Sequence, residues 1–141
     1  MLLVDLAALA TALFSGAAAY VTLVEHPARM SCSTQIAIAQ WRPSYRRATV
    51  MQASLAVVGT LTAIAAWLHG DGWAWLMAGV ILGAVIPFTL LVMWPTNKRL
   101  EDEGLDISSQ EARNLLVRWG KLHSVRSALG LFALSLMLFM R

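Results

Sequence analysis

The stretch 73–94 reads WAWLMAGVILGAVIPFTLLVMW and contains no charged side chain. A helix needs about 20 consecutive apolar residues to cross the roughly 30 Å hydrocarbon core of a bilayer, and this stretch is long enough. Three further apolar runs, at about residues 2–24, 48–68 and 122–140, meet the same requirement. Because lipid cannot satisfy backbone hydrogen bonds, the four runs predict an all-α fold, an integral membrane four-helix bundle.

The composition agrees with this class. The chain has 141 residues, of which 58% are hydrophobic and 13% charged, whereas soluble domains carry roughly 25% charged residues. This length allows a single four-helix transmembrane domain over residues 1–141. The one cysteine, Cys32, has no partner for an internal disulfide. The net charge of +3 comes mostly from arginines in short loops, so it indicates membrane orientation and argues against nucleic-acid binding.

Basic residues are concentrated in the two longer predicted loops, residues 25–47 and 95–121, whereas the opposite side has only Arg141. Loops rich in lysine and arginine stay in the cytoplasm. We therefore expect a multi-pass protein of the inner (plasma) membrane with both loops in the cytoplasm and both termini outside.

Polar residues gather toward the predicted cytoplasmic ends of the helices, where each needs a partner or a function. Gln52 lies inside the second helix, and a buried amide requires hydrogen-bond partners. Pro27 and Pro95 are expected to end the first and third helices, and Pro87 is expected to kink the third. No internal repeat is evident from the residues themselves.

The most specific spacing lies at the start of the fourth helix. Trp119, His123 and Arg126 occupy positions i, i+4 and i+7 and therefore share one helix face. Arg126 falls within the predicted span, and an intramembrane arginine usually faces a bundle interior or an aqueous cavity. An aromatic ring, a group that titrates near neutrality and a permanent cation on one stripe predict a site. His26 would lie at the same depth.

Five segments resemble one known family. They are Val24–Ala28, Trp41–Ala48, Ile86–Thr89, Pro95–Leu100 and Arg118–Arg126. Together they resemble the anthrone-oxygenase-like membrane proteins, whose domain was long catalogued as of unknown function. The resemblance spans about residues 14 to 137. The Pro-Thr-Asn and Trp-x-x-x-His-x-x-Arg elements are its most specific parts.

The resemblance implies an oxidoreductase that converts anthrones to anthraquinones, as some members do in polyketide pathways, without flavin or nicotinamide. The family pattern falls on His26, Pro27, Trp41, Pro43, Tyr45, Pro95, Thr96, Asn97, Trp119, His123 and Arg126. We therefore expect a membrane-embedded oxygenase-like protein acting on a hydrophobic, polycyclic aromatic substrate at the cytoplasmic side of the bundle.

Under this hypothesis His123 is the base and Arg126 stabilises the substrate oxyanion, with Asn97 or Tyr45 donating a hydrogen bond. The residues expected to bind the substrate are Trp119, Trp41, Gln52 and Thr96.

Two alternatives remain open from the sequence. In the first, His26 and His123 ligate haem or copper, since bundles build such sites between facing helices; the cofactor is then haem or copper rather than none. In the second, the protein is a non-catalytic membrane scaffold or partner subunit. Under all of these hypotheses the expected partners are the lipid bilayer and further copies of the chain in a homo-oligomer. If the protein is an enzyme, a hydrophobic small molecule is a further partner.

Overall fold

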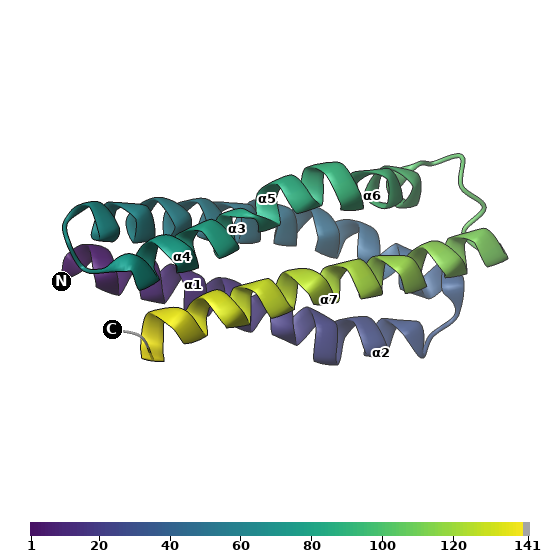
Figure 1. Ribbon diagram of the computed structural model, residues 1–141. Helices are drawn as coiled ribbons and strands as arrows, with labels where there is room; N and C mark the ends of the chain where they lie inside the picture. The colour runs from purple at the N-terminus through teal and green to yellow at the C-terminus, as the bar shows by residue number, and fades with distance from the viewer. Residues whose placement is uncertain (140–141) are drawn as a thin grey trace.

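The computed structural model describes residues 1–139 as four long helical rods joined by short connections (Figure 1). The rods are Leu2–Met30, Thr34–Leu68, Trp73–Glu101 and Gln110–Phe139. All four are long and apolar enough to cross a membrane, which confirms the predicted all-α membrane bundle. Residue 140, the predicted end of the last span, and Arg141 lie outside the described residues.

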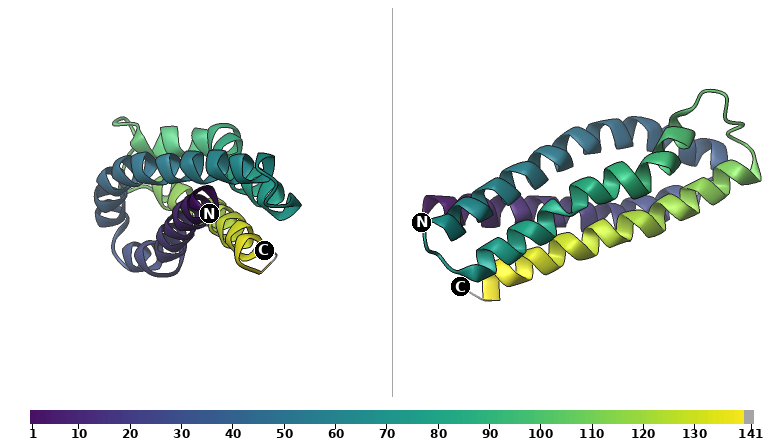
Figure 2. Two further views of the ribbon diagram at one scale, coloured as in Figure 1. Left: turned by 90° about the vertical axis from the view of Figure 1, so that its left-hand side faces the viewer. Right: turned by 45° about the horizontal axis from the view of Figure 1, so that its top comes forward.

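The rods form an up-and-down bundle. The N-terminal residues, the described end of the fourth rod at Phe139 and the connection at residues 69–72 lie at one end, hereafter the terminal end (Figures 1 and 2). The connections at residues 31–33 and 102–109 lie at the other, hereafter the loop end. Each rod packs against the next one in sequence, and the first also packs against the fourth. The first and third rods are therefore diagonal to each other, as are the second and fourth.

The helices run well beyond the predicted spans. Residues 25–47 and 95–121 were expected to be loops, but most of them are helical, and only residues 31–33 and 102–109 connect the rods at the loop end. A hydropathy pattern detects the part of a helix that is apolar enough for lipid and misses its polar extension into water. Which turns of each rod lie inside the bilayer stays a prediction.

The first and third rods each contain a π-helical turn followed by a proline. The first consists of α1 (Leu2–Tyr20), a π-helical turn η1 (Val21–Glu25) and α2 (His26–Met30); the third consists of α4 (Trp73–Gly83), α5 (Val85–Phe88), a π-helical turn η2 (Thr89–Met93) and α6 (Trp94–Glu101). Each π-helical turn is followed directly by a residue-proline pair, His26-Pro27 or Trp94-Pro95. π-Helical turns are rare in proteins as a whole, and those that occur are often found at functional sites.

The prediction that Pro27 and Pro95 end their helices is wrong. Each proline lies in the first turn of the α-helix that resumes after the π-helical turn. Proline is tolerated there because the amide that it lacks belongs to the first turn, whose amides have no intrahelical acceptor in an ordinary helix. The kink expected from Pro87 is confirmed, since the third rod is interrupted at Ala84, one turn earlier (Figure 1).

Helix packing is tight toward the terminal end. A Cβ atom on Gly59 of α3 (Thr34–Leu68) would lie 2.7 Å from Leu82, and one on Gly130 of α7 (Gln110–Phe139) would lie 2.9 Å from Phe14. Small residues at such contacts let helix backbones approach closely in a membrane. The core at the loop end instead contains large side chains, among them Trp41 and Trp119. The bundle is therefore broader where the candidate site lies.

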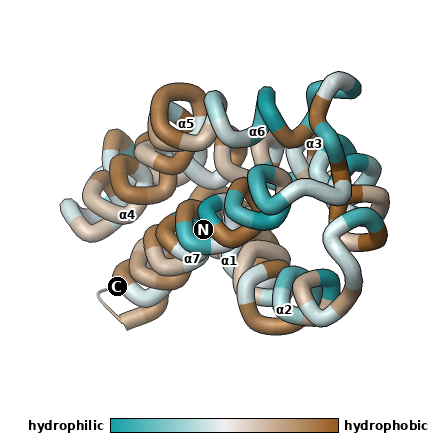
Figure 3. The backbone as a smooth tube through the Cα atoms, turned by 90° about the vertical axis from the view of Figure 1, so that its right-hand side faces the viewer, coloured by the Kyte–Doolittle hydropathy of each residue, from teal (hydrophilic) through white to brown (hydrophobic). Residues whose placement is uncertain are grey.

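The outer surface of the bundle is apolar over much of its length. Leu13, Leu61, Leu90 and Phe132 are each at least half exposed. Such an apolar exterior matches lipid as the surrounding solvent. Hydrophilic segments gather at the loop end, as the view onto that end shows (Figure 3).

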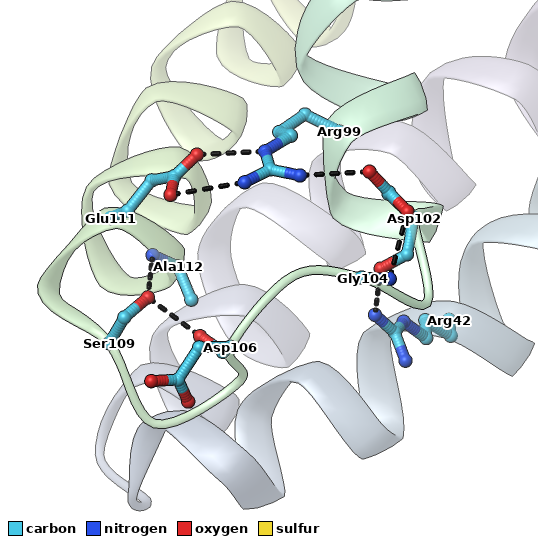
Figure 4. A network of polar contacts seen from close by, with 8 residues as sticks. All are labelled: Arg42, Arg99, Asp102, Gly104, Asp106, Ser109, Glu111 and Ala112. Atoms are coloured by element: carbon cyan, nitrogen blue, oxygen red, sulfur yellow. Dashed lines mark hydrogen bonds and ion pairs between the residues drawn. The ribbon is translucent and has the colours of Figure 1, made fainter.

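A polar network covers the loop end (Figure 4). Arg99 donates to Glu111 at 2.8 and 3.2 Å and to Asp102 at 2.8 Å. The amide of Ala112 donates to Ser109 Oγ at 3.1 Å, so Ser109 caps the start of the fourth rod. The network therefore joins the third and fourth rods just beyond the site.

Candidate functional site

A small cavity lies inside the loop end of the bundle, and we call it the central cavity. It is lined by Val21, Arg29, Ser44, Tyr45, Ala48, Thr49, Gln52, Trp119, His123 and Arg126. Three of the four rods contribute these side chains. Its volume of about 20 Å³ is enough for a single water molecule.

Arg126 reaches toward the middle of the bundle. Its Nη2 donates to Gln52 Oε1 at 3.1 Å, across the diagonal between the fourth and second rods. Its guanidinium carbon lies 5.7 Å from the centre of the Phe14 ring. Its Nε is buried without an acceptor, and among the described residues no carboxylate forms an ion pair with Arg126. A partly buried cation without a counter-ion favours binding of an anionic oxygen.

His123 is held by a chain of hydroxyl groups. Its Nδ1 lies 3.1 Å from Thr22 Oγ1, which lies 2.7 Å from Ser127 Oγ. Ser127 in turn donates to the His123 carbonyl at 3.4 Å. If each hydroxyl donates once along this chain, the first donor is His123 Nδ1–H, and Nε2 keeps its lone pair. The arrangement therefore favours a neutral imidazole with Nε2 free to accept a proton.

Aromatic rings support the polar groups. Trp41 stacks on Tyr45 at 4.6 Å between ring centres and meets the edge of Trp119 at 5.8 Å. Trp119 stacks on His123 at 4.8 Å. Trp41 is fully buried and does not line the central cavity. It supports Tyr45 and Trp119 from behind.

A partly buried ion pair closes the cavity on the side of the first rod. Glu25 accepts hydrogen bonds from Arg29 and Ser44, and from Gln40 at 3.1 Å. The guanidinium of Arg29 lies over the Trp119 ring at 5.5 Å, and its Nε and Nη1 have no acceptor. Glu25 therefore fixes Arg29 while leaving two of its donors unused.

The third rod contributes Asn97, which is buried. Its amide lies beside the Tyr45 hydroxyl, in a contact that falls short of good hydrogen-bond geometry. Tyr45 also separates the central cavity from an open hollow of about 680 Å³ at the loop end, lined by Trp94, Pro95 and Lys98 among others.

Comparison with known proteins identifies the family. The profile of the anthrone oxygenase family matches residues 41–136. The chain is 30% identical to an anthrone oxygenase of Claviceps purpurea over 91% of this chain and 82% of that protein. The chain belongs to the anthrone oxygenase family.

Two further relatives match over shorter stretches. Anthrone oxygenase tpcL of Aspergillus fumigatus is 43% identical over 61 residues, which cover 41% of this chain and 38% of that protein. Noranthrone monooxygenase of Aspergillus flavus is 37% identical over 82 residues, which cover 50% of this chain and 39% of that protein. No solved structure matches the chain.

Most of the site residues predicted from the sequence of this family member come together. Tyr45, Gln52, Trp119, His123 and Arg126 line the central cavity, and Asn97 and Trp41 lie directly behind it. Thr96 is buried but is not among the residues described as lining the cavity. The roles assigned to these residues stay predictions.

His26 lies apart from the central cavity. Its ring packs on Trp119 at 5.1 Å and lines a separate surface groove with Thr22, Gly120 and Lys121. Among the described residues no group of three or more His, Cys, Asp or Glu side chains could hold a metal ion. A haem macrocycle would not fit in the volume of the central cavity. Ligation of a metal by His26 and His123 stays a prediction to which this geometry adds no support.

Sequence reasoning missed Arg29, Thr22 and Ser127. Arg29 was read as an orientation signal, although Glu25 and Arg29 have the i, i+4 spacing of a helical ion pair. This ion pair can be predicted from the sequence only if the helix is assumed to continue past Pro27. Thr22 and Ser127 carried no signal, because a hydroxyl in an apolar helix ordinarily bonds to its own backbone.

Proposed function

We propose that the protein is a membrane-embedded oxygenase that oxidises a polycyclic aromatic substrate of the anthrone type with dioxygen. The relatives named anthrone oxygenase and noranthrone monooxygenase support this class of reaction. The observation that carries the proposal is the partly buried guanidinium of Arg126, which has no carboxylate partner among the described residues and shares a cavity with His123.

Among the buried polar atoms in and behind the walls of the central cavity that have no partner, N–H donors outnumber acceptors. Arg29 Nε and Nη1, Arg126 Nε, Trp41 Nε1 and Trp119 Nε1 are buried N–H groups without an acceptor. Leaving such donors unpaired costs free energy, so the region is complementary to a ligand that brings electron-rich oxygen. The oxyanion of a deprotonated anthrone is such a ligand, and donors already in position stabilise developing charge well.

The proposed reaction begins with a proton transfer. His123 Nε2 removes a proton from the methylene carbon of the anthrone, and the negative charge moves to the carbonyl oxygen, where Arg126 binds it. Dioxygen accepts the electrons of this enolate. One oxygen atom becomes the new carbonyl of the anthraquinone, and the other leaves as water with the two methylene hydrogens. The equation balances with dioxygen as the only oxidant.

Trp119 supports the base of this step, His123. It stacks on His123 at 4.8 Å and lies beneath the Arg29 guanidinium. These contacts fix the imidazole ring while Thr22 fixes its tautomer. The proposal therefore gives Trp119 and Thr22 positioning roles and reserves the catalytic roles for His123 and Arg126.

The proposal is tested with purified protein in lipid nanodiscs and 1,8-dihydroxyanthrone as substrate. We expect anthraquinone formation and oxygen uptake above the rate of spontaneous oxidation in empty nanodiscs, and no product without oxygen. A rate equal to that of empty nanodiscs would overturn the proposal. An optical spectrum with metal analysis of the same sample tests the haem and copper alternative independently.

We further propose that the loop end faces the cytoplasm. The basic residues of that end support this orientation. Cys32 is the only cysteine in the sequence, is exposed and lies in the connection at residues 31–33. A membrane-impermeant maleimide should label it in inside-out vesicles and fail to label it in intact spheroplasts. Labelling in intact spheroplasts would reverse the orientation.

A further inference from the structure

A second cavity adjoins the central one, and we call it the lateral chamber. It has a volume of about 120 Å³ and lies between α3 and the third rod. Its lining consists of Thr49, Ala53, Ala56, Val85, Ile86, Thr89, Leu90 and Arg126. Seven of these eight residues come from the second and third rods, and five of the seven are alanine, valine, isoleucine or leucine.

The shape of the third rod creates this space. Toward the terminal end, α3 and α4 are in close contact, since a Cβ atom on Gly79 would lie 3.2 Å from Ala63 and one on Gly83 would lie 3.1 Å from Thr60. Directly after Gly83 the helix is interrupted at Ala84, and the π-helical turn η2 follows. The third rod bends at this interruption (Figure 1). The chamber begins where the close contact ends.

The chamber runs from the core to the outer surface. Ala56 and Val85 at its inner end are 1% and 2% exposed, whereas Leu90 at its mouth is 58% exposed. The Thr89 hydroxyl donates to the Val85 carbonyl at 2.8 Å, so it offers little polarity to a ligand. Both rods are apolar enough to cross a membrane, and a mouth formed by an exposed leucine matches lipid as its surrounding solvent.

The lateral chamber and the central cavity share two wall residues, Thr49 and Arg126. Among the described residues that line the chamber, Arg126 alone is charged, and its guanidinium also reaches the central cavity. An apolar chamber with one cation at its inner end is complementary to an apolar ring system that carries an electron-rich oxygen at one edge.

We propose that the lateral chamber is the binding site for the ring system of a planar aromatic ligand that enters from the bilayer between α3 and η2. Arg126 holds the ligand's oxygen at the inner end of the chamber, where the chamber adjoins the central cavity that His123 lines. The inference rests on the proposed function and adds the route and the bound position of the substrate. Since drug-sized ligands occupy pockets of roughly 300–1,000 Å³, part of the ring system remains in the lipid-facing mouth.

The test fills the mouth of the chamber with a larger side chain. Ala53 is exposed and lines the chamber, so Ala53→Phe narrows the mouth without disturbing a buried contact. Ser54→Phe is the matched control, because Ser54 is the next residue, is exposed and does not belong to the chamber lining. Its hydroxyl donates only to Val50 O of its own helix, at 2.7 Å.

Binding is measured with 1,8-dihydroxyanthraquinone, which cannot be oxidised in this reaction, through quenching of tryptophan fluorescence in nanodiscs. We expect Ala53→Phe to weaken binding about tenfold or more and Ser54→Phe to stay within about twofold of wild type. Equal affinities for wild type and Ala53→Phe would overturn the inference. Similar losses in both variants would also overturn it, because an effect that does not depend on the chamber lining would come from the added ring in general and not from a filled chamber.

A second ligand tests the role of Arg126 in the chamber. Anthracene has the same three-ring body without oxygen. Arg126→Met should weaken binding of 1,8-dihydroxyanthraquinone while leaving anthracene binding nearly unchanged, and equal effects on both would contradict the proposed orientation. Absence of turnover with intact binding of 1,8-dihydroxyanthraquinone would refute the proposed oxygenase activity alone, so the two failures are distinguishable.

Discussion

Arg126 and Gln52 join the fourth and second rods across the diagonal of the bundle, with 3.1 Å between Nη2 and Oε1. Gln52 is 3% exposed, and its amide oxygen accepts the hydrogen bond from the Arg126 guanidinium. An amide oxygen orients a guanidinium without neutralising it, because it carries only a partial charge. The pairing therefore positions Arg126 and preserves its full charge for a ligand.

Replacing Arg126 should reduce turnover much more than it reduces stability. We expect Arg126→Met to lower kcat by about 100-fold, as loss of one oxyanion-stabilising group does, while removal of an unpaired buried charge leaves the bundle folded. Arg126→Lys keeps the charge but lacks the planar fork and should recover only part of the rate. The measurement is steady-state oxidation of 1,8-dihydroxyanthrone, with thermal unfolding of each variant as control. Full kcat in Arg126→Met would remove Arg126 from the mechanism.

His123 should be indispensable, and Thr22 should act through it. His123→Ala is expected to lower kcat by about 100-fold or more, which is the usual contribution of a general base. Thr22→Val preserves the shape of the side chain but removes the hydroxyl 3.1 Å from His123 Nδ1, and we expect a loss of about tenfold in kcat with KM unchanged. Thr22→Ser retains a hydroxyl and should restore most of the rate.

A purely structural role for Thr22 gives a different pattern. Its loss would then lower thermal stability and leave kcat per folded molecule unchanged, and Thr22→Val would not alter the pH profile of kcat. If His123→Ala retains full turnover, both assignments fail together.

Much of this architecture is readable from the sequence because the bilayer imposes strong constraints. Runs such as 73–94 are long, apolar and uncharged, and only a helix satisfies its backbone within lipid. The Trp119, His123 and Arg126 stripe is likewise a local property of one helix, and the structure directs all three toward the central cavity. Spacing within a helix is enough to predict a shared face.

Features that depend on contacts between rods could not be predicted from the sequence. The hydrogen bond from Arg126 to Gln52 depends on which helices are diagonal, and helical periodicity carries no such information. The two π-helical turns lie in ordinary apolar sequence, and they make the prolines after them compatible with continued helix. Misreading Pro27 as a helix end also concealed Arg29 as a wall of the cavity.

Acidification should loosen the connection at residues 102–109 before it affects the bundle. The Gly104 amide donates to Asp102 at 2.9 Å, and this bond, together with Arg99, holds the pKa of Asp102 below its usual 3.8. The Ser108 hydroxyl and amide lower the pKa of Asp106 in the same way. Because both values are depressed in the folded chain, their stabilising contribution is present above about pH 4 and is lost as the pH falls through the lower, folded values.

This pH dependence is measurable by NMR in detergent micelles. The amide shifts of Gly104 and Ser108 should titrate with midpoints below the ordinary value for aspartate, while amides within α3 and α7 stay constant. Asp102→Asn should abolish the Gly104 titration and leave that of Ser108. A Gly104 midpoint at or above 3.8 would contradict the assigned hydrogen bond.

Gly120 of the fourth rod lies directly against His26 of the first rod, beside the site. A Cβ atom on Gly120 would lie 2.5 Å from both Cδ2 and Nε2 of His26, so Gly120→Ala forces the imidazole or the helix to move. We expect it to lower the free energy of unfolding by about 1–3 kcal/mol, the usual cost of overpacking. Gly16→Ala is the matched control, because a Cβ atom there meets nothing within 4 Å, and it should be neutral or slightly stabilising. Thermal unfolding in detergent measures both, and His26→Ala should rescue Gly120→Ala by removing the overlapping ring. Equal stabilities of Gly120→Ala and Gly16→Ala would show that His26 does not pack on Gly120.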